Sequence, residues 1–186
     1  LQECIDIIKD GGMVYFPDGT YLISSALIFY SNQTLKFSDN AIVLRSDKSE
    51  PLTRYLLASY SEPEWSGYEG THDVIISGGV FDGNANLTEK STLINTVHCK
   101  NILIENCRFV HCSTWHMIEI NSTENATVQN CVFDGPTYTS IHEGLLNEEI
   151  QLERLLKRNR ATALDIKKIN SYSKFEKNKE KADFVI

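Results

Sequence analysis

The residues of this chain that are best suited to chemistry are two glutamates and two histidines: Glu119, Glu143, His116 and His142. Hydrolysis of a glycosidic bond uses two carboxyl groups about 5–9.5 Å apart, whereas a lyase uses a base near C5 of a uronate and a cation that neutralises its carboxylate. On adjacent parallel strands, Glu119 and Glu143 would lie about 5 Å apart. We therefore predict these four residues as catalytic candidates.

Three further residues near this group are suited to holding a sugar. Trp115 and Tyr138 carry aromatic faces on which sugar rings can stack, and Asp134 lies in an Asp-Gly turn that would border the same groove. A structural interpretation stays open for all of them, because aromatic rings also pack in cores and exposed carboxylates are usually solvated. Side chains alternate between the two faces of a strand, so Met117 and Glu119 should share one face. We therefore expect either that Met117 is exposed or that Glu119 is partly enclosed.

A repeat along the chain positions these residues. The segments 73–84, 101–112 and 125–136 each begin with Asp or Asn and continue with alternating apolar residues. Each has a phenylalanine eight positions after its first residue: Phe81, Phe109 and Phe133. The last two segments start 24 residues apart, and such a period is typical of stacked-repeat folds. Short strands with Asn and Gly corners predict an all-β, right-handed, single-stranded parallel β-helix, and an antiparallel sandwich is the competing fold.

Alignment of the repeats predicts which residues stack from coil to coil. Cys107 and Cys131 occupy equivalent interior positions. The strand spacing would allow a disulfide between them, and we predict the reduced pair. A second strand follows in each repeat, at 92–96, 116–120 and 140–144, and an Asp/Asn ladder forms at the turn: Asp73, Asn101 and Asn125.

The pattern predicts one principal domain. A β-helix is expected over 1–146, opened by a capping helix over 2–10 and interrupted by an excursion over 47–72 that carries no repeat. A charged helical or disordered tail is expected over 147–186, with helix favoured at 148–158. The chain opens without a signal-like segment and its period stops abruptly, as expected of an excised fragment.

Charge and composition exclude several classes of partner and cofactor. The net charge is −7, and residues 1–146 hold 18 acidic and 8 basic side chains, so an acidic body argues against nucleic acid as the main partner. No apolar run approaches the roughly 20 residues of a membrane helix. The five cysteines form no Cys-x-x-Cys pair, no His cluster completes a zinc site, and calcium has no supporting motif. We therefore predict no cofactor.

The segment GGMVYFPDGTYLIS and the repeats VIISGGVFDGN and ATVQNCVFDG resemble the pectin-lyase-like β-helix superfamily of polygalacturonases, pectate lyases and phage tailspike depolymerases. The resemblance covers about 1–146 and implies a right-handed parallel β-helix. Polygalacturonases carry Asn-Thr-Asp, Asp-Asp, Gly-His-Gly and Arg-Ile-Lys, but here Val97 follows Asn95 and Thr96, and the other three elements are absent. The calcium-binding acids and catalytic arginine of pectate lyases have no counterpart that can be placed. In similar proteins a strand follows the last coil, so 148–153 could be a strand instead of a helix start.

Two functions are consistent with these patterns. The first is a carbohydrate-active β-helix protein, similar to polysaccharide lyases and glycoside hydrolases, that is secreted or at the cell surface and acts on a polysaccharide. The second is a non-catalytic β-helix segment of a phage tail, adhesin or surface protein that binds glycan or supports other domains. Absence of the polygalacturonase motifs favours the second function.

Overall fold

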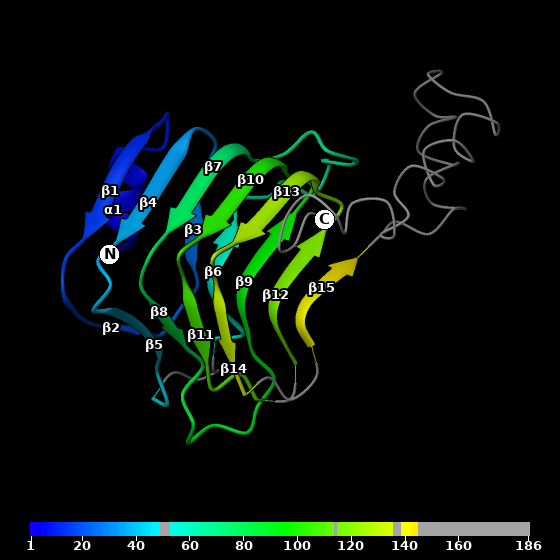
Figure 1. Cartoon of the computed structure of the whole chain (residues 1–186). Helices are drawn as coiled ribbons and strands as arrows, with labels where there is room; N and C mark the ends of the chain where they lie inside the picture. The colour runs from blue at the N-terminus through cyan, green and yellow to red at the C-terminus, as the bar shows by residue number, and fades with distance from the viewer. Residues whose placement is uncertain (49–52, 114, 136–138, 145–186) are drawn as a thin grey trace.

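The computed structural model describes residues 1–48, 53–113, 115–135 and 139–144, and these residues form a right-handed parallel β-helix. Each coil contributes one strand to each of three parallel five-stranded sheets, which Figure 1 shows wound around a common interior. Sheet A contains β1 (Gly12–Phe16), β4 (Gln33–Phe37), β7 (His72–Ser77), β10 (Lys100–Glu105) and β13 (Glu124–Gln129). Sheet B contains β2 (Gly19–Ile23), β5 (Ala41–Arg45), β8 (Val80–Asp82), β11 (Arg108–Val110) and β14 (Val132–Asp134). Sheet C contains β3 (Leu27–Phe29), β6 (Tyr55–Ser59), β9 (Thr92–Val97), β12 (His116–Asn121) and β15 (Thr139–Gly144).

The interior is a column of stacked apolar side chains. Phe109 aligns with Phe81 on one side and with Phe133 on the other, at ring-centroid distances of 5.4 and 5.1 Å. The aligned Phe81 and Phe109 are fully buried, which confirms that the repeated phenylalanine points inward. Burying a side chain of this size contributes roughly 1.5–3 kcal/mol. The column therefore supplies much of the energy that holds the coils together.

The predicted Asp/Asn ladder is confirmed at the start of sheet A. Asn125 Nδ2 donates to Asn101 Oδ1 at 3.0 Å, and Asn101 Nδ2 donates to Asp73 Oδ1 at 2.7 Å. All three residues have φ between 54° and 56°, a left-handed conformation that Asn and Asp tolerate better than most residues. This is why the repeat begins with these residue types.

The interior cysteines also stack as predicted. Cys107 is buried, Cys131 is partly buried, and both are free thiols. The Cys107 thiol donates to the carbonyl of Glu105 at 3.1 Å and the Cys131 thiol to that of Gln129 at 3.3 Å. The interaction between the two thiols raises the pKa of Cys107 and lowers that of Cys131.

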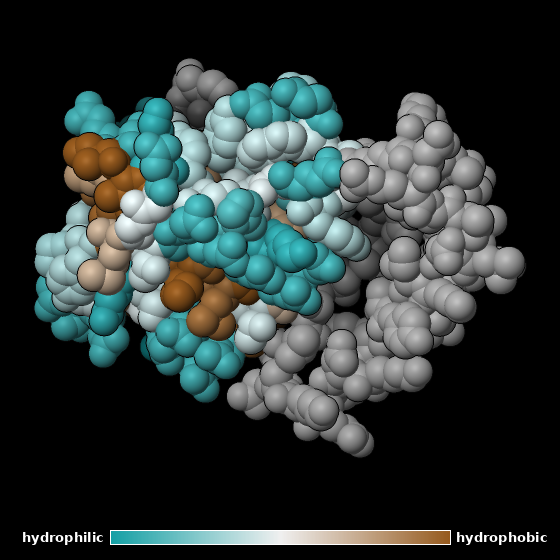
Figure 2. Space-filling model, turned by 90° about the horizontal axis from the view of Figure 1, so that it is seen from above, coloured by the Kyte–Doolittle hydropathy of each residue, from teal (hydrophilic) through white to brown (hydrophobic). Residues whose placement is uncertain are grey.

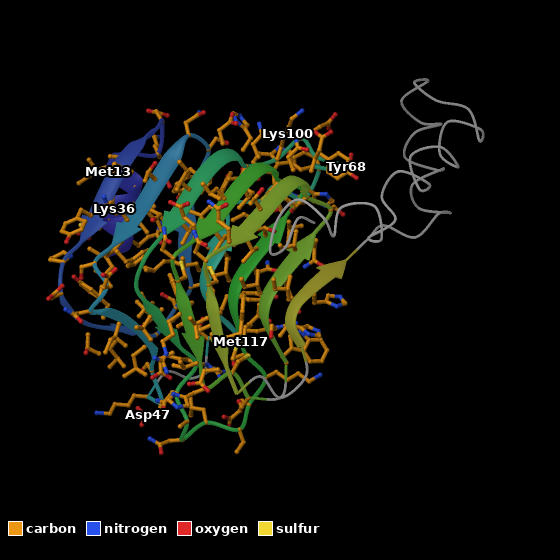
Figure 3. The ribbon with its side chains drawn as sticks, in the orientation of Figure 1. Met13, Lys36, Asp47, Tyr68, Lys100 and Met117 are labelled. Atoms are coloured by element: carbon orange, nitrogen blue, oxygen red, sulfur yellow. The ribbon has the colours of Figure 1, made fainter. Side chains whose placement is uncertain are left out.

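The outer face of sheet A is polar for most of its length, with apolar side chains among the polar ones. Figure 2 views the molecule from above, the side on which Figure 1 draws the strands of sheet A, and shows hydrophobic areas bordered by hydrophilic ones. Met13, Tyr15 and Ile75 are exposed there, and Figure 3 shows Met13 and Lys36 near the first coil. Only the first coil places two large apolar side chains on this outer face.

Two of the predicted elements need correction. The capping helix α1 (Gln2–Ile7) ends before Lys9, because Ile8 leaves the helical conformation ahead of Gly11 and Gly12. The excursion expected over 47–72 contains β6, which pairs with β3 and β9 inside sheet C. The predicted tail over 147–186, with its alternatives at 148–158 and 148–153, and Tyr138 lie outside the described residues.

Candidate functional site

The connections from sheet B to sheet C differ in length from coil to coil, and their described residues 46–48, 53–54, 83–91, 111–113 and 115 are here called the B–C corner. Because the coils are in register, the ends of these connections lie above one another. Arg54 precedes β6, Lys90 lies two residues before β9, and Trp115 precedes β12. Three successive coils therefore contribute one large side chain each to the same place.

Two cations lie against one indole ring at this corner. Arg54 Cζ is 5.4 Å and Lys90 Nζ is 4.2 Å from the ring centroid of Trp115, within the range of cation–π attraction. Arg54 Cζ also lies 5.3 Å from the ring of Tyr55. Trp115 was predicted as a platform for a sugar, but in this arrangement its ring holds two cations.

Glu119 lies beside these cations and is almost enclosed. Its Oε1 accepts a hydrogen bond from Trp115 Nε1 and lies 3.4 Å from Arg54 Nη2. The side chain of Glu119 is 8% exposed, whereas that of Arg54 is 45% exposed. Met117 is also buried, so both side chains on this face of the strand are enclosed and the prediction of a partly enclosed Glu119 is met. The Glu119 carboxylate consequently fixes the Arg54 guanidinium on one side, while the other side of the guanidinium remains available to solvent.

The two predicted histidines do lie together. The rings of His116 and His142 stack with centroids 4.4 Å apart and an interplanar angle of 12°. Burial lowers the pKa of His116, and the nearby His142 and Arg54 lower it further, while Glu119 acts in the opposite direction. His116 is therefore a neutral imidazole at neutral pH and can accept a proton.

The two predicted glutamates do not stack. Glu119 aligns with His142, and Glu143 aligns with Ile120. The strands β12 and β15 pair with an offset of 23 residues, although β10 and β13 pair with an offset of 24, because the connection before β15 is one residue shorter. A one-residue shift reverses which face a strand position occupies. The backbone register therefore does not place these two positions opposite each other.

The predicted binding residue Asp134 lies elsewhere. It is exposed at the end of β14 in sheet B, where its Oδ2 pairs with Arg108 Nη2 at 3.0 Å. This pair belongs to the outer face of sheet B.

Arg54 and Lys90 were missed from the sequence. Both belong to connections that differ in length from coil to coil, so neither falls on the 24-residue repeat. A usable signal was their position one or two residues ahead of short strands of apolar and hydroxyl residues, at Tyr55–Ser59 and Thr92–Val97. We call the residues gathered here the corner cluster: Arg54, Lys90, Trp115, His116, Glu119 and His142.

The corner cluster has the chemistry of an anion site. Of the eight basic side chains within residues 1–146, two meet at Trp115 although the surrounding body is acidic. One carboxylate, that of Glu119, is already engaged by Arg54 and Trp115. Guanidinium and ammonium groups that are partly exposed bind carboxylates through charge-assisted hydrogen bonds. The arrangement suits a ligand that carries a carboxylate.

Other kinds of site receive no support from the described part of the chain. It contains no group of three or more His, Cys, Asp or Glu side chains placed to hold a metal ion. Within the same residues, no helix has the length and apolar character needed to cross a lipid bilayer.

A family model matches almost the whole chain. The model described as rhamnogalacturonase A/epimerase, pectate lyase-like matches residues 1–180. This match extends beyond residue 146, into the segment that the sequence pattern assigned to a tail.

A curated relative is a bacterial surface protein. Plasmin and fibronectin-binding protein A of Streptococcus pneumoniae is 29% identical to this chain over an alignment 189 residues long. The alignment covers 89% of this chain and 26% of that protein. This chain thus spans about a quarter of the length of that relative. The crystal structure of PfbA, a surface adhesin of Streptococcus pneumoniae, has a TM-score of 0.61 at 26% identity and covers 71% of this chain and 34% of its own.

A second solved structure supports the fold alone. A candidate glycosyl hydrolase from Parabacteroides merdae has a TM-score of 0.54 at 15% identity, with 76% of this chain and 80% of that chain covered. One similar structure is thus of an adhesin and another of a candidate enzyme.

Proposed function

The chain belongs to the rhamnogalacturonase A/epimerase, pectate lyase-like family, and from this premise we propose that its β-helix is the polysaccharide-binding segment of a cell-surface protein. We propose the corner cluster as the place where an acidic glycan binds. The domain that carries it corresponds to the β-helix expected over 1–146. A surface location is supported by the relative that is described as a surface adhesin.

One observation carries this proposal. Arg54 and Lys90 converge on Trp115 from consecutive coils, and Glu119 holds Arg54 in place while leaving it 45% exposed. A guanidinium fixed in this way loses less conformational entropy when it binds a carboxylate than a free surface arginine does. A uronate residue of an acidic polysaccharide supplies that carboxylate.

A lyase reaction is the catalytic step that the corner cluster suits best. Arg54 would neutralise the uronate carboxylate, which makes the C5 proton more acidic, and neutral His116 would remove that proton. The electron pair then forms the C4–C5 double bond and breaks the bond from C4 to the leaving oxygen, which takes a proton from solvent. Hydrolysis is less well supported, because Glu143 does not align with Glu119.

A second candidate function is binding of host proteins. The relative named plasmin and fibronectin-binding protein A matches 89% of this chain. A protein partner would use a broader surface than the corner cluster alone, since specific protein interfaces bury roughly 800 Å² on each partner. This function predicts binding that does not depend on Arg54.

The test compares an acidic with a neutral oligosaccharide. Wild type should bind an oligogalacturonate and discriminate against an uncharged oligosaccharide of the same length, by isothermal titration calorimetry. Arg54→Gln should weaken binding of the oligogalacturonate by roughly 10- to 100-fold, the value of a hydrogen bond to a charged group. Lys36→Gln removes one positive charge from the outer face of sheet A and serves as the matched control, with unchanged affinity.

Two further measurements separate the candidate functions. Absorbance at 235 nm detects the unsaturated uronate that a lyase releases, and an assay of new reducing ends detects hydrolysis. Binding that is insensitive to Arg54→Gln, or wild-type binding of plasmin and fibronectin without binding of any acidic glycan, would contradict the proposed glycan site.

A further inference from the structure

A buried arginine lies directly behind the corner cluster. Arg45 is the last residue of β5 and continues the inward-facing series of Ala41 and Val43. It is 1% exposed, although interior positions of this kind normally carry apolar side chains. Placing a guanidinium inside a β-helix is costly, so its contacts indicate what it is for.

The guanidinium is bound by backbone carbonyls from two coils. Its Nε donates to the carbonyl of Thr53 at 2.7 Å. Its Nη1 and Nη2 donate to the carbonyls of Glu89 and Lys90 at 3.1 and 3.3 Å. Thr53 immediately precedes Arg54, and Lys90 is itself a member of the corner cluster. One side chain therefore fixes the backbone of both cations that lie over Trp115.

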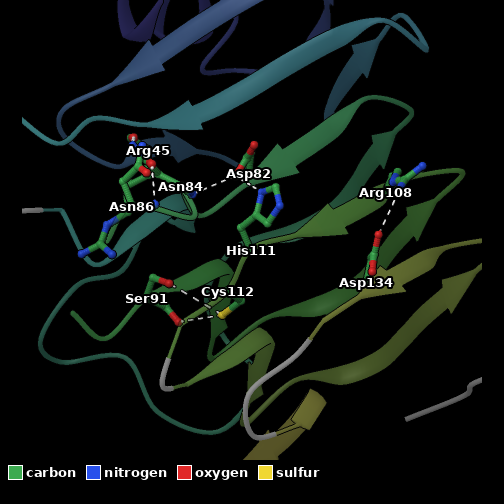
Figure 4. A network of polar contacts seen from close by, with 9 residues as sticks. All are labelled: Arg45, Asp82, Asn84, Asn86, Ser91, Arg108, His111, Cys112 and Asp134. Carbon is green, nitrogen blue, oxygen red and sulfur yellow. Dashed lines mark hydrogen bonds and ion pairs between the residues drawn. The ribbon is translucent and has the colours of Figure 1, made fainter. Parts of the chain in front are cut away.

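The same network extends to the coil that carries Trp115. The carbonyl of Arg45 accepts Asn84 Nδ2 at 3.0 Å, which holds the start of the connection that leads to Lys90. Further along that connection, the carbonyl of Ser91 accepts the Cys112 thiol at 3.1 Å. Cys112 also donates to the carbonyl of His116, at 3.3 Å. Figure 4 shows Arg45, Asn84, Ser91 and Cys112 along this line behind the B–C corner.

We propose that Arg45 is a positioning residue: by binding three carbonyls of two B–C connections, it holds Arg54 and Lys90 over Trp115 and thereby sets the affinity of the corner cluster for acidic sugar. This inference rests on the proposed glycan site. Arg45 is buried and does not touch the ligand. Its five N–H donors in a planar fork explain why an arginine occupies the position, because no other side chain reaches three separate carbonyls in this way.

The proposal has a readout that needs no ligand. The chain has two tryptophans, so Trp65→Phe leaves Trp115 as the single indole reporter. Cations over an indole attract iodide and repel caesium, and the ratio of the two quenching constants therefore measures whether Arg54 and Lys90 are in place. In this background, Arg45→Met should lower the iodide-to-caesium ratio roughly twofold, the effect of moving a unit charge away through solvent.

Affinity supplies the second measurement, on the 186-residue chain. Arg45→Met should weaken oligogalacturonate binding roughly tenfold, the equivalent of about one charge-assisted hydrogen bond. Val43→Ala truncates a buried neighbour in the same strand. It should lower the melting temperature without changing either the quenching ratio or the affinity. Arg45→Lys keeps the charge but not the fork, and both of its values should fall between those of wild type and Arg45→Met.

The outcomes are distinct. An unchanged quenching ratio in Arg45→Met overturns the proposal, and so does a Val43→Ala variant that lowers the ratio equally. If Arg45→Met does not fold, Arg45→Lys decides in the same way. If the ratio falls but wild type binds no oligogalacturonate, the positioning of Arg54 and Lys90 stands while the proposed glycan function fails.

Discussion

The outer faces of sheets A and C are carried by the same coils and are organised in opposite ways. On sheet A, the row at the start of the strands repeats Asp or Asn, and these bond to one another: Asn125 donates to Asn101 and Asn101 to Asp73, at 3.0 and 2.7 Å. Further along the same face, Ser77 and Gln129 both donate to Glu105, at 3.3 and 2.9 Å. On sheet C, one aligned row contains five different residues: Ile28, Ala58, Asn95, Glu119 and His142. The first face repeats one interaction, whereas the second assembles unlike groups.

The difference shows where a solenoid can place a site. A ladder of like residues satisfies its own hydrogen bonds and leaves little chemistry for a ligand. Unlike residues in one row bring different chemical groups together, such as the Glu119 carboxylate and the aligned His142, whose ring stacks on that of His116. The connections over sheet C also vary in length, so they can bring Arg54 and Lys90 above this row. Departure from the repeat therefore marks the candidate site.

Truncation of one glutamate on each face should give the largest difference in stability. Glu119→Ala removes an enclosed carboxylate that binds Trp115 and Arg54. It should lower the free energy of unfolding by about 2 kcal/mol, less than for a fully buried ion pair because Arg54 can return to water. Glu105→Ala on sheet A should cost about 1 kcal/mol or less, because solvent can replace its partly exposed bonds. Urea unfolding followed by circular dichroism measures both, and equal losses would contradict the comparison.

A smaller effect is expected from the turn of sheet A. Asn101 has φ of 54° and bridges Asp73 to Asn125. Asn101→Ala should lower the free energy of unfolding by about 1 kcal/mol, chiefly through the strain of a left-handed alanine. Asn101→Gly removes the same side chain without that strain and should cost less. Thermal unfolding distinguishes the two variants, and neither should change the affinity for oligogalacturonate.

The repeat made most of the architecture predictable. Phe81, Phe109 and Phe133 stack as expected, and so does the ladder led by Asp73, because these side chains are selected by the same backbone geometry in every coil. The strand β6 was missed since its coil has Val43 at the position aligned with Phe81, so the phenylalanine that precedes the later sheet C strands is lacking. A strand can thus join a sheet through backbone hydrogen bonds without carrying the sequence pattern of its neighbours.

The candidate site was only partly predictable. His116 and His142 were predicted as catalytic candidates in one group with Glu119, and their rings stack. Glu119 and Glu143 were predicted at corresponding or nearly corresponding positions, and the register pairs Glu143 with Ile120, because the connection before β15 is one residue shorter. Arg54 and Lys90 could not be found from periodicity, because their contacts depend on loop lengths and on the buried Arg45. The sequence repeat therefore predicts which residues stack from strand to strand. It does not predict which side chains of the connections, such as Arg54 and Lys90, lie over those strands.

The smallest expected effect is a dependence of stability on pH, near neutrality, that arises from His116 on sheet C. His116 is buried, and its folded-state pKa lies below the ordinary value of 6.5. The groups that face it are His142 and Arg54, which oppose its protonation, and Glu119, which favours it. Below about pH 6.5 the unfolded chain binds a proton at this histidine more readily than the folded chain does, so stability rises with pH through that range.

The measurement compares wild type with a variant on each face. Between pH 7.5 and 5.5, wild type should lose less than about 1 kcal/mol of unfolding free energy through this histidine. His116→Gln should remove that part of the pH dependence. His72→Gln takes an exposed histidine from the first residue of β7 and should leave it intact. Equal pH dependence in wild type and His116→Gln would show that burial on sheet C does not set the protonation of His116, and the case for this imidazole as a base would then lose its support.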